Sequence, residues 1–215
     1  MKSTSFNPRL GLIFALILTP GIAAADELSD DIASLGHGWA KAYYQTPDNQ
    51  KDAAFTSLQA RAHQVSSQFA GRAEPLVWEA IITSSHAKYQ GMFAAGKGVT
   101  TARDLLLAAQ KINPQALDGS VFTSLGSLYY KVPGWPLSFG DKDKARSCLL
   151  QALKLNPNGI DPNFFYGEYL SERGDTAKAV EFLKRALAAA PRPGREDADA
   201  GRRAELQILL KKLGS

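Results

Sequence analysis

Cysteine and histidine are scarce in this 215-residue chain. The one cysteine, Cys148, excludes a disulfide within the chain, and we expect it to be a buried, unreactive thiol. The three histidines, His37, His63 and His86, fall on different expected helices. No His-x-x-x-His or Cys-x-x-Cys pair occurs, so a metal site has no support. A Gly-x-Ser-x-Gly motif and a complete phosphate-binding loop are also missing. We therefore expect no cofactor and no catalytic residues, in a protein that works by binding.

The chain also has no large excess of positively or negatively charged residues. The formal net charge is +4, and two of the positive residues, Lys2 and Arg9, lie at the extreme N-terminus. Without these two residues the net charge is about +2. This balance is too even for a surface that binds nucleic acid, so we expect no nucleic acid partner.

Long apolar runs are missing everywhere except near the N-terminus. The run at residues 10–18 is too short to span a bilayer comfortably. Together with the positive start and the small residues Ala23-Ala24-Ala25 before Asp26, it is typical of a secretory signal peptide. We therefore expect residues 1–25 to be cleaved and residues 26–215 to form one exported domain without stable membrane insertion. The alternative is an N-terminal anchor that stays uncut.

Small residues recur with a period of 34 residues. Gly167 is followed by Ala179 and Ala186 at the offsets of the tetratricopeptide pattern, and Ala145 and Ala152 lie 34 residues before these two alanines. The pattern has a physical cause, because a glycine and an alanine facing each other let two antiparallel helices approach closely. We therefore expect stacked helix pairs with a tetratricopeptide register.

The same signature extends over the whole exported domain. It predicts an all-α, tetratricopeptide-type helical-hairpin solenoid of about four helix pairs, closed by a C-terminal capping helix. The cap is expected because the last pair otherwise exposes its stacking face. The expected segments include a first helix around Ile32–Trp39, a second at 53–69, a third at 74–91, a fourth around 102–114 and a cap at 195–213.

An apolar insert interrupts the third helix pair. Gly126 and Ala145, the small residues that mark the two helices of this pair, are 19 positions apart. The corresponding residues of the fourth pair, Gly167 and Ala179, are 12 positions apart. The extra residues hold two prolines and two glycines, which favour a stiff turn, and the apolar Trp135, Leu137 and Phe139. Two interpretations are open. In the first, which we expect of large aromatics near a core, Trp135 and Phe139 fill the gap between helix pairs. In the second, they line a pocket or contact a partner.

The first helices of stacked pairs line the concave surface, where we expect a partner or ligand to bind. The inward-facing positions are predicted to be Glu79, Thr83, His86, Thr123, Ser127, Tyr130, Phe164, Glu168 and Ser171. The candidate binding residues are Tyr130, Trp135, Phe139, Phe164, Glu168, Arg195 and Arg202.

Two sets of charged residues have competing interpretations. Glu168 and Glu172 are one helical turn apart, a spacing that suits acid–base chemistry, but a solvated or partner-facing helix side is the expectation because no nucleophile or metal joins them. Arg195, Arg202 and Arg203 lie at the expected cap. We expect them to form ion pairs that fix the cap, the alternative being that they receive an acidic partner. Their expected acidic partners are Asp197, Asp199 and the Asp161 region.

Three segments resemble a known family: "VPGWPLSFGDKDKA", "LNPNGIDPNFFYGEYL" and "APRPGREDADAGRRAELQILL". They are similar to the tetratricopeptide-like T component found with TRAP transporters, the tripartite carriers that take up small acids and other solutes. The resemblance implies a periplasmic protein that contacts a solute-binding protein and handles an apolar ligand. Members are often lipoproteins, and this chain lacks the corresponding cysteine, which puts membrane attachment in doubt.

Other functions and an oligomeric state are left open by the residues. The runner-up is a general periplasmic scaffold or chaperone for envelope assembly, and a remote alternative is a hydrolase or lyase that uses Glu168 and Glu172. A homo-oligomer is compatible with the pattern.

Overall fold

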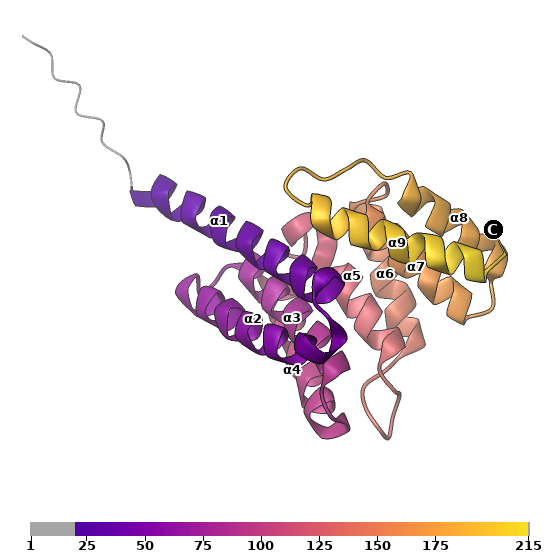
Figure 1. The fold of residues 1–215 in the computed structure, drawn as a ribbon, viewed down its shortest axis with the longest axis horizontal. Coiled ribbons are helices and arrows are strands. Elements are labelled where there is room, and N and C mark those ends of the chain that lie inside the picture. Colours follow the sequence, from indigo (N-terminus) through magenta and orange to yellow (C-terminus); the bar gives the residue numbers. More distant parts are fainter. Residues whose placement is uncertain (1–19, 215) are drawn as a thin grey trace, which may run out of the picture.

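The computed structural model describes residues 20–214, and within this range the regular structure is helical (Figure 1). Residues 1–19 of the predicted signal peptide lie outside the described residues. Of the described helices, none has the length and apolar character needed to cross a bilayer. The α-helices are α1 (Pro20–Ala40), α2 (Asp48–Gln68), α3 (Ala73–His86), α4 (Met92–Ile112), α5 (Ala116–Lys131), α6 (Lys142–Leu155), α7 (Ile160–Glu172), α8 (Thr176–Leu187) and α9 (Glu196–Lys212).

The helices form the predicted solenoid. The pairs α1–α2, α3–α4, α5–α6 and α7–α8 stack in chain order, and α9 packs on α7 and α8 as the cap. A π-helical turn (Lys41–Gln45) extends α1, and a 3-10 turn (Ala87–Tyr89) extends α3. The prediction of an all-α helical-hairpin solenoid is therefore confirmed.

Close packing within the pairs depends on the predicted small residues. A Cβ atom on Gly126 of α5 would lie 2.6 Å from Cγ of Leu149 on α6. In the next pair, a Cβ on Gly167 would lie 2.8 Å from Cγ of Leu183 and 3.2 Å from the carbonyl oxygen of Ala179. Contacts this short leave no room for a larger residue. The tetratricopeptide register read from these positions is therefore confirmed.

The insert between α5 and α6 differs from the prediction. Trp135 is 90% exposed and Leu137 is 84% exposed, so the expectation that Trp135 fills a gap is wrong. The reason is the narrow base of the turn, where the Gly140 N–H donates to the Pro133 carbonyl at 2.9 Å and leaves the tip outside the core. Phe139, at the base, does pack, edge-on against Tyr129 at 6.0 Å between ring centroids.

The two ends of the solenoid meet, which the sequence did not indicate. α9 runs beside α7 and α8 and also contacts α1 (Figure 1). The Tyr44 hydroxyl, just after α1, donates to Glu205 of α9 at 3.1 Å, and His37 of α1 lies 3.0 Å from Asp197. The capping helix thereby joins the two ends of the solenoid around its concave face.

Candidate functional site: the concave cavity

The concave face contains a cavity with a volume of about 630 Å³. Its wall is built from the first helices of all four pairs, from α4, from α9 with the segment before it, and from the base and tip of the insert. The wall is mainly apolar and includes six aromatic side chains: Trp39, Tyr43, Tyr44, Trp78, Phe164 and Phe165.

Three of these aromatics form a continuous cluster from α1 to α3. The Trp39 and Tyr43 rings are stacked, with centroids 5.1 Å apart, and Trp39 lies 6.4 Å from Trp78. The Trp39 indole N–H donates to the Ser85 hydroxyl at 2.9 Å, which fixes the ring orientation. We call Trp39, Tyr43 and Trp78 the aromatic wall.

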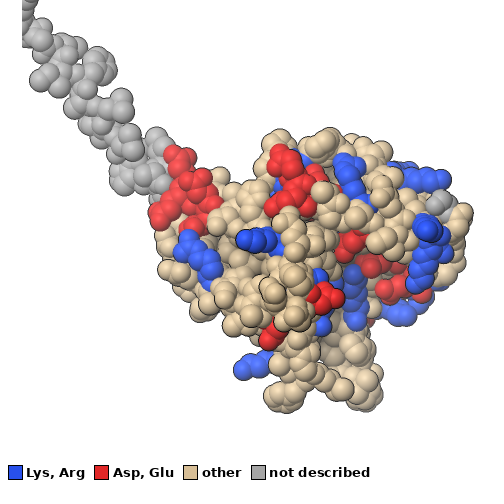
Figure 2. All heavy atoms as spheres, viewed as in Figure 1, with Lys and Arg blue, Asp and Glu red and all other residues tan. Residues whose placement is uncertain are grey.

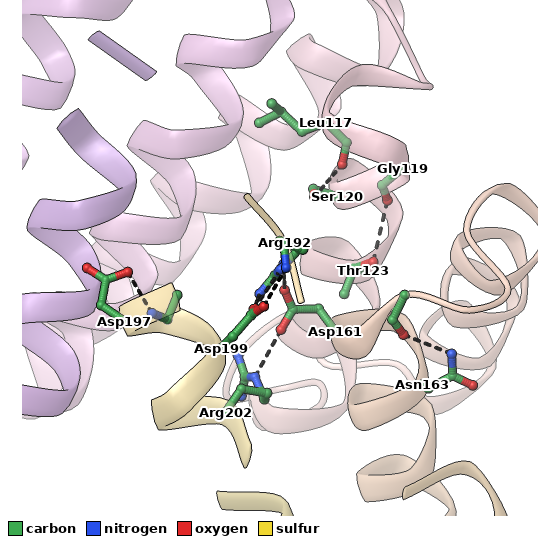
Figure 3. Close-up of polar contacts among 12 residues, drawn as sticks. Leu117, Gly119, Ser120, Thr123, Asp161, Asn163, Arg192, Asp197, Asp199 and Arg202 are labelled. Carbon is green, nitrogen blue, oxygen red and sulfur yellow. Dashed lines mark hydrogen bonds and ion pairs between the residues drawn. The ribbon is translucent and has the colours of Figure 1, made fainter. Parts of the chain in front are cut away.

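A buried charge network joins α7 to α9 and to the segment before α9 (Figure 3). Asp161 accepts from Nε of Arg202 at 2.9 Å and from Nη1 of Arg192 at 2.7 Å, and Arg192 lies 2.6 Å from Asp199. Burial would raise the pKa of Asp161, but the two guanidinium groups outweigh burial and hold that pKa well below its ordinary value. Asp161 therefore remains charged and fixes the cap, as predicted for Arg202.

The other two predicted arginines behave differently. Arg203 donates to the carbonyl oxygens of Leu187 and Ala189 at the C-terminal end of α8, where unpaired carbonyls attract cations. The prediction for Arg195 is wrong, because it forms no ion pair with the acids expected for it. Arg192 pairs with Asp161 and Asp199 instead. The Arg195 guanidinium instead lies over the Trp78 ring, 5.0 Å from its centroid.

Glu168 is already occupied by protein partners. It accepts from the Tyr130 hydroxyl at 2.5 Å and pairs with the Lys131 ammonium at 2.7 Å. Burial would raise the pKa of Glu168, but Lys131 and these hydrogen bonds leave it below its ordinary value. Partial burial and the nearby Glu168 charge raise the pKa of Glu172. Glu168 is thus a charged ion-pair partner of Lys131 in the cavity wall.

The predicted binding residues fall into two groups. Phe164, Glu168, Arg195 and Arg202 line the cavity. The remaining three lie apart from it: Tyr130 is buried behind Glu168, Phe139 is packed at the base of the insert, and Trp135 is exposed at its tip.

Of the predicted concave positions, two of the three on α5 face the cavity, Tyr130 being the exception, and none of those on α3 does. Thr123 and Ser127 line the cavity. Glu79 and His86 instead turn toward α2, where Glu79 contacts His63 at 2.9 Å and His86 contacts Asp52 at 2.9 Å. Thr83 is buried and Ser171 is not in the cavity wall. The α3 residues that face the cavity are Trp78, Ile81, Ser84 and Ser85.

Sequence reasoning missed the aromatic wall. Trp39 and Trp78 lie on α1 and α3, which contact each other directly, and the repeat pattern does not show which side chains meet across that contact. No group of three or more histidine, cysteine or acidic side chains is placed to hold a metal within residues 20–214. Burial raises the pKa of Cys148 to about 11, in agreement with an unreactive thiol.

The comparisons with known proteins concern the repeat. The family model described as "Tetratricopeptide repeat" matches residues 137–158 and 160–193. Among solved structures, AMB-1 MamA is 20% identical with a TM-score of 0.46, over 85% of this chain and 95% of MamA. Pseudomonas aeruginosa PilF is 14% identical with a TM-score of 0.36, over 88% and 93% of the two chains. No curated protein sequence matches. The repeat match covers α6, α7 and α8 and agrees with the helical-hairpin solenoid of the structure. Solenoids of stacked helix pairs present concave surfaces that bind partners.

Proposed function

We propose that this is an exported, periplasmic, non-enzymatic binding protein and an accessory of a TRAP-type solute-uptake system. In this proposal it holds an apolar solute in the concave cavity and docks to a solute-binding protein. The observation that carries the proposal is the concave cavity itself, whose mainly apolar wall is built from both joined ends of the solenoid.

The size and lining of the cavity support a small ligand. Sites for small molecules are concave, mostly apolar and about 300–1,000 Å³ in volume, with a few polar groups that fix orientation. A volume of about 630 Å³ with an aromatic wall fits this description. The charged residues toward α9 supply the polar end.

Two apolar projections beside the cavity support docking to a protein. Met92 and Phe93 begin α4, Trp135 and Leu137 form the tip of the insert, and all four side chains are exposed. Met92 and Leu137 also belong to the cavity wall, so both projections stand at the same opening. Figure 2 shows the lower projections of the molecule free of charged side chains over most of their surface. Exposed apolar patches of this kind mark interaction sites.

A binding titration tests the proposal. The protein is titrated by calorimetry with the solute-binding subunit of a TRAP-type system from the same genome, and we expect a saturable complex. The double variant Phe93→Ser/Trp135→Ser should weaken that complex at least tenfold, as expected when aromatic anchors are lost, without lowering the melting temperature. Ile208→Ser is the matched control, because Ile208 is an exposed apolar residue of α9 outside the cavity wall.

The second candidate is a general periplasmic scaffold or chaperone for envelope assembly. The match to the tetratricopeptide repeat favours it equally, since this repeat serves many partners. A chaperone would bind several unfolded envelope proteins with similar affinity and ignore the folded solute-binding protein. Titration against both kinds of partner therefore separates the two functions, and fractionation of cells tests export independently.

A further inference from the structure

We infer that the cavity binds an organic anion, with its apolar body against the aromatic wall and its carboxylate on Arg195. This inference rests on the part of the proposed function in which the cavity holds a solute. It adds the chemical class of that solute, which the apolar lining alone does not define.

Arg195 lines the cavity and has no acidic ion-pair partner among residues 20–214. Among the described residues it forms no ion pair and no side-chain hydrogen bond, and its Nε is buried without a hydrogen-bond acceptor. Burial and the neighbouring Arg192 charge lower the pKa of Arg195, and they outweigh the longer-range attraction of Asp161, Asp199 and Asp197. A half-buried charge without an ion-pair partner costs free energy that an incoming anion would recover.

The other arginines at this end of the cavity are already neutralised. Arg192 pairs with Asp161 and Asp199, and Arg202 pairs with Asp161 and Glu205. Each of these guanidinium groups has two carboxylate contacts. Arg195 therefore differs from its neighbours by geometry, because it stands over the Trp78 ring and forms no ion pair with the acids that serve them.

A second unpaired cation lies at the far end of the same aromatic wall. The Lys88 ammonium is 4.6 Å from the centroid of Tyr43 and contacts the Tyr43 hydroxyl, with no carboxylate partner in the described part of the chain. Tyr43 stacks on Trp39, which adjoins Trp78 and hence Arg195. The aromatic wall is thus bracketed by two cations, and both line the cavity.

This arrangement selects against neutral and cationic solutes. A neutral apolar molecule would leave the Arg195 donors without an acceptor, and a cation would face two uncompensated positive charges. The acids in the wall, Asp161, Glu168 and Glu205, are each already bonded to protein donors. A carboxylate matches the guanidinium fork and accepts two hydrogen bonds from it.

Three ligands of equal chain length test the inference: decanoate, decanol and decylammonium, each titrated into the purified protein with calorimetry and tryptophan fluorescence as readouts. We expect decanoate to bind at least tenfold more tightly than decanol, and decylammonium to bind most weakly. Arg195→Gln should reduce decanoate affinity about tenfold and leave decanol affinity unchanged, as for loss of a charged hydrogen bond. The control is Arg185→Gln, because Arg185 also stacks on an aromatic ring, at 4.9 Å from Phe182, but lies outside the cavity wall.

Other outcomes overturn the inference in distinguishable ways. Equal binding of decanoate and decanol, or an unchanged preference in Arg195→Gln, refutes the anion site while the proposed apolar cavity stands. Absence of binding by all three ligands refutes both. Should Arg195→Gln fail to fold by thermal melting, Lys88→Gln gives the same test at an exposed position, with an expected loss for decanoate of about threefold.

Discussion

The Tyr44 hydroxyl and the Glu205 carboxylate are hydrogen-bonded at 3.1 Å although 161 positions separate them in the sequence. This contact joins the first helix pair to the capping helix. Beside it, Gly201 of α9 lies so close to Tyr44 that a Cβ atom there would be 2.3 Å from the tyrosine ring. The closure of the solenoid therefore depends on a glycine on one side and an aromatic ring on the other.

Gly201→Ala should push α9 away from Tyr44. We expect a loss of about 1–3 kcal/mol in the free energy of unfolding, as for overpacking of a tight contact, measured by denaturant titration. The matched control is Gly96→Ala. Gly96 is also helical, but its added Cβ would meet nothing within 4 Å. Alanine there should stabilise the protein by about 0.5–1 kcal/mol, because glycine is a poor helix former. Equal effects of the two substitutions would contradict the contact.

The sequence predicts the parts of this fold that repeat and misses those that occur once. Gly167 and Ala179 are informative because every tetratricopeptide pair needs small residues at the same helix contact. The Tyr44–Glu205 contact has no periodic counterpart, since it depends on how far four pairs rotate around the superhelix. The expectation that Trp135 fills a gap is wrong for a related reason. Composition shows that a residue is apolar, but it does not show whether a core lies within reach.

The same limit applies to the site. Phe164 was predicted as an inward-facing position of a first helix, and Arg202 as one of the arginines of the expected cap. Arg195 was expected to pair with nearby acids, but Asp199 and Asp161 are engaged by Arg192 and Arg202. Which of several adjacent arginines stays unpaired is decided by side-chain geometry, and the sequence pattern contains no such information.

Asp161→Asn should destabilise the cap and change its response to acid. The substitution leaves Arg202 and Arg192 without their shared carboxylate, and we expect a loss of about 3 kcal/mol at neutral pH. Because the folded pKa of Asp161 is depressed, its contribution is complete above the ordinary pKa of about 4 and declines as the pH falls below it. The stability difference between the native protein and the variant should therefore shrink between pH 5 and about pH 2, as followed by denaturant titration.

A surface ion pair provides the control for this pH dependence. Glu181 and Arg185 pair on the exposed face of α8. Glu181→Gln should change the free energy of unfolding by about 0.5 kcal/mol or less. A constant difference between the native protein and Asp161→Asn across the acid range would contradict the assignment of Asp161 as a charged partner.

Trp135→Ala and Phe139→Ala should affect the stability of the protein differently, although both residues belong to the insert. Trp135 is exposed, so its removal should leave the melting temperature unchanged. Phe139 packs on Tyr129 and lies under the Arg103 guanidinium, 4.6 Å from the ring centroid. Its partial burial predicts a loss of about 2 kcal/mol, less than for a fully buried aromatic. A destabilising Trp135→Ala would show that the tip of the insert folds back onto the protein.

Ala179→Leu tests the repeat register directly. Ala179 is fully buried in α8, and its carbonyl oxygen lies against Gly167 of α7. Three added carbon atoms would force the two helices apart, with an expected loss of about 1–3 kcal/mol in a thermal or denaturant melt. Ala177→Leu, two positions earlier on the exposed side of α8, should change stability little, because alanine and leucine both favour helix. The difference between these neighbouring substitutions separates a specific helix contact from a general effect of side-chain size, and equal melting of the two variants would mean that the fourth pair is held together elsewhere.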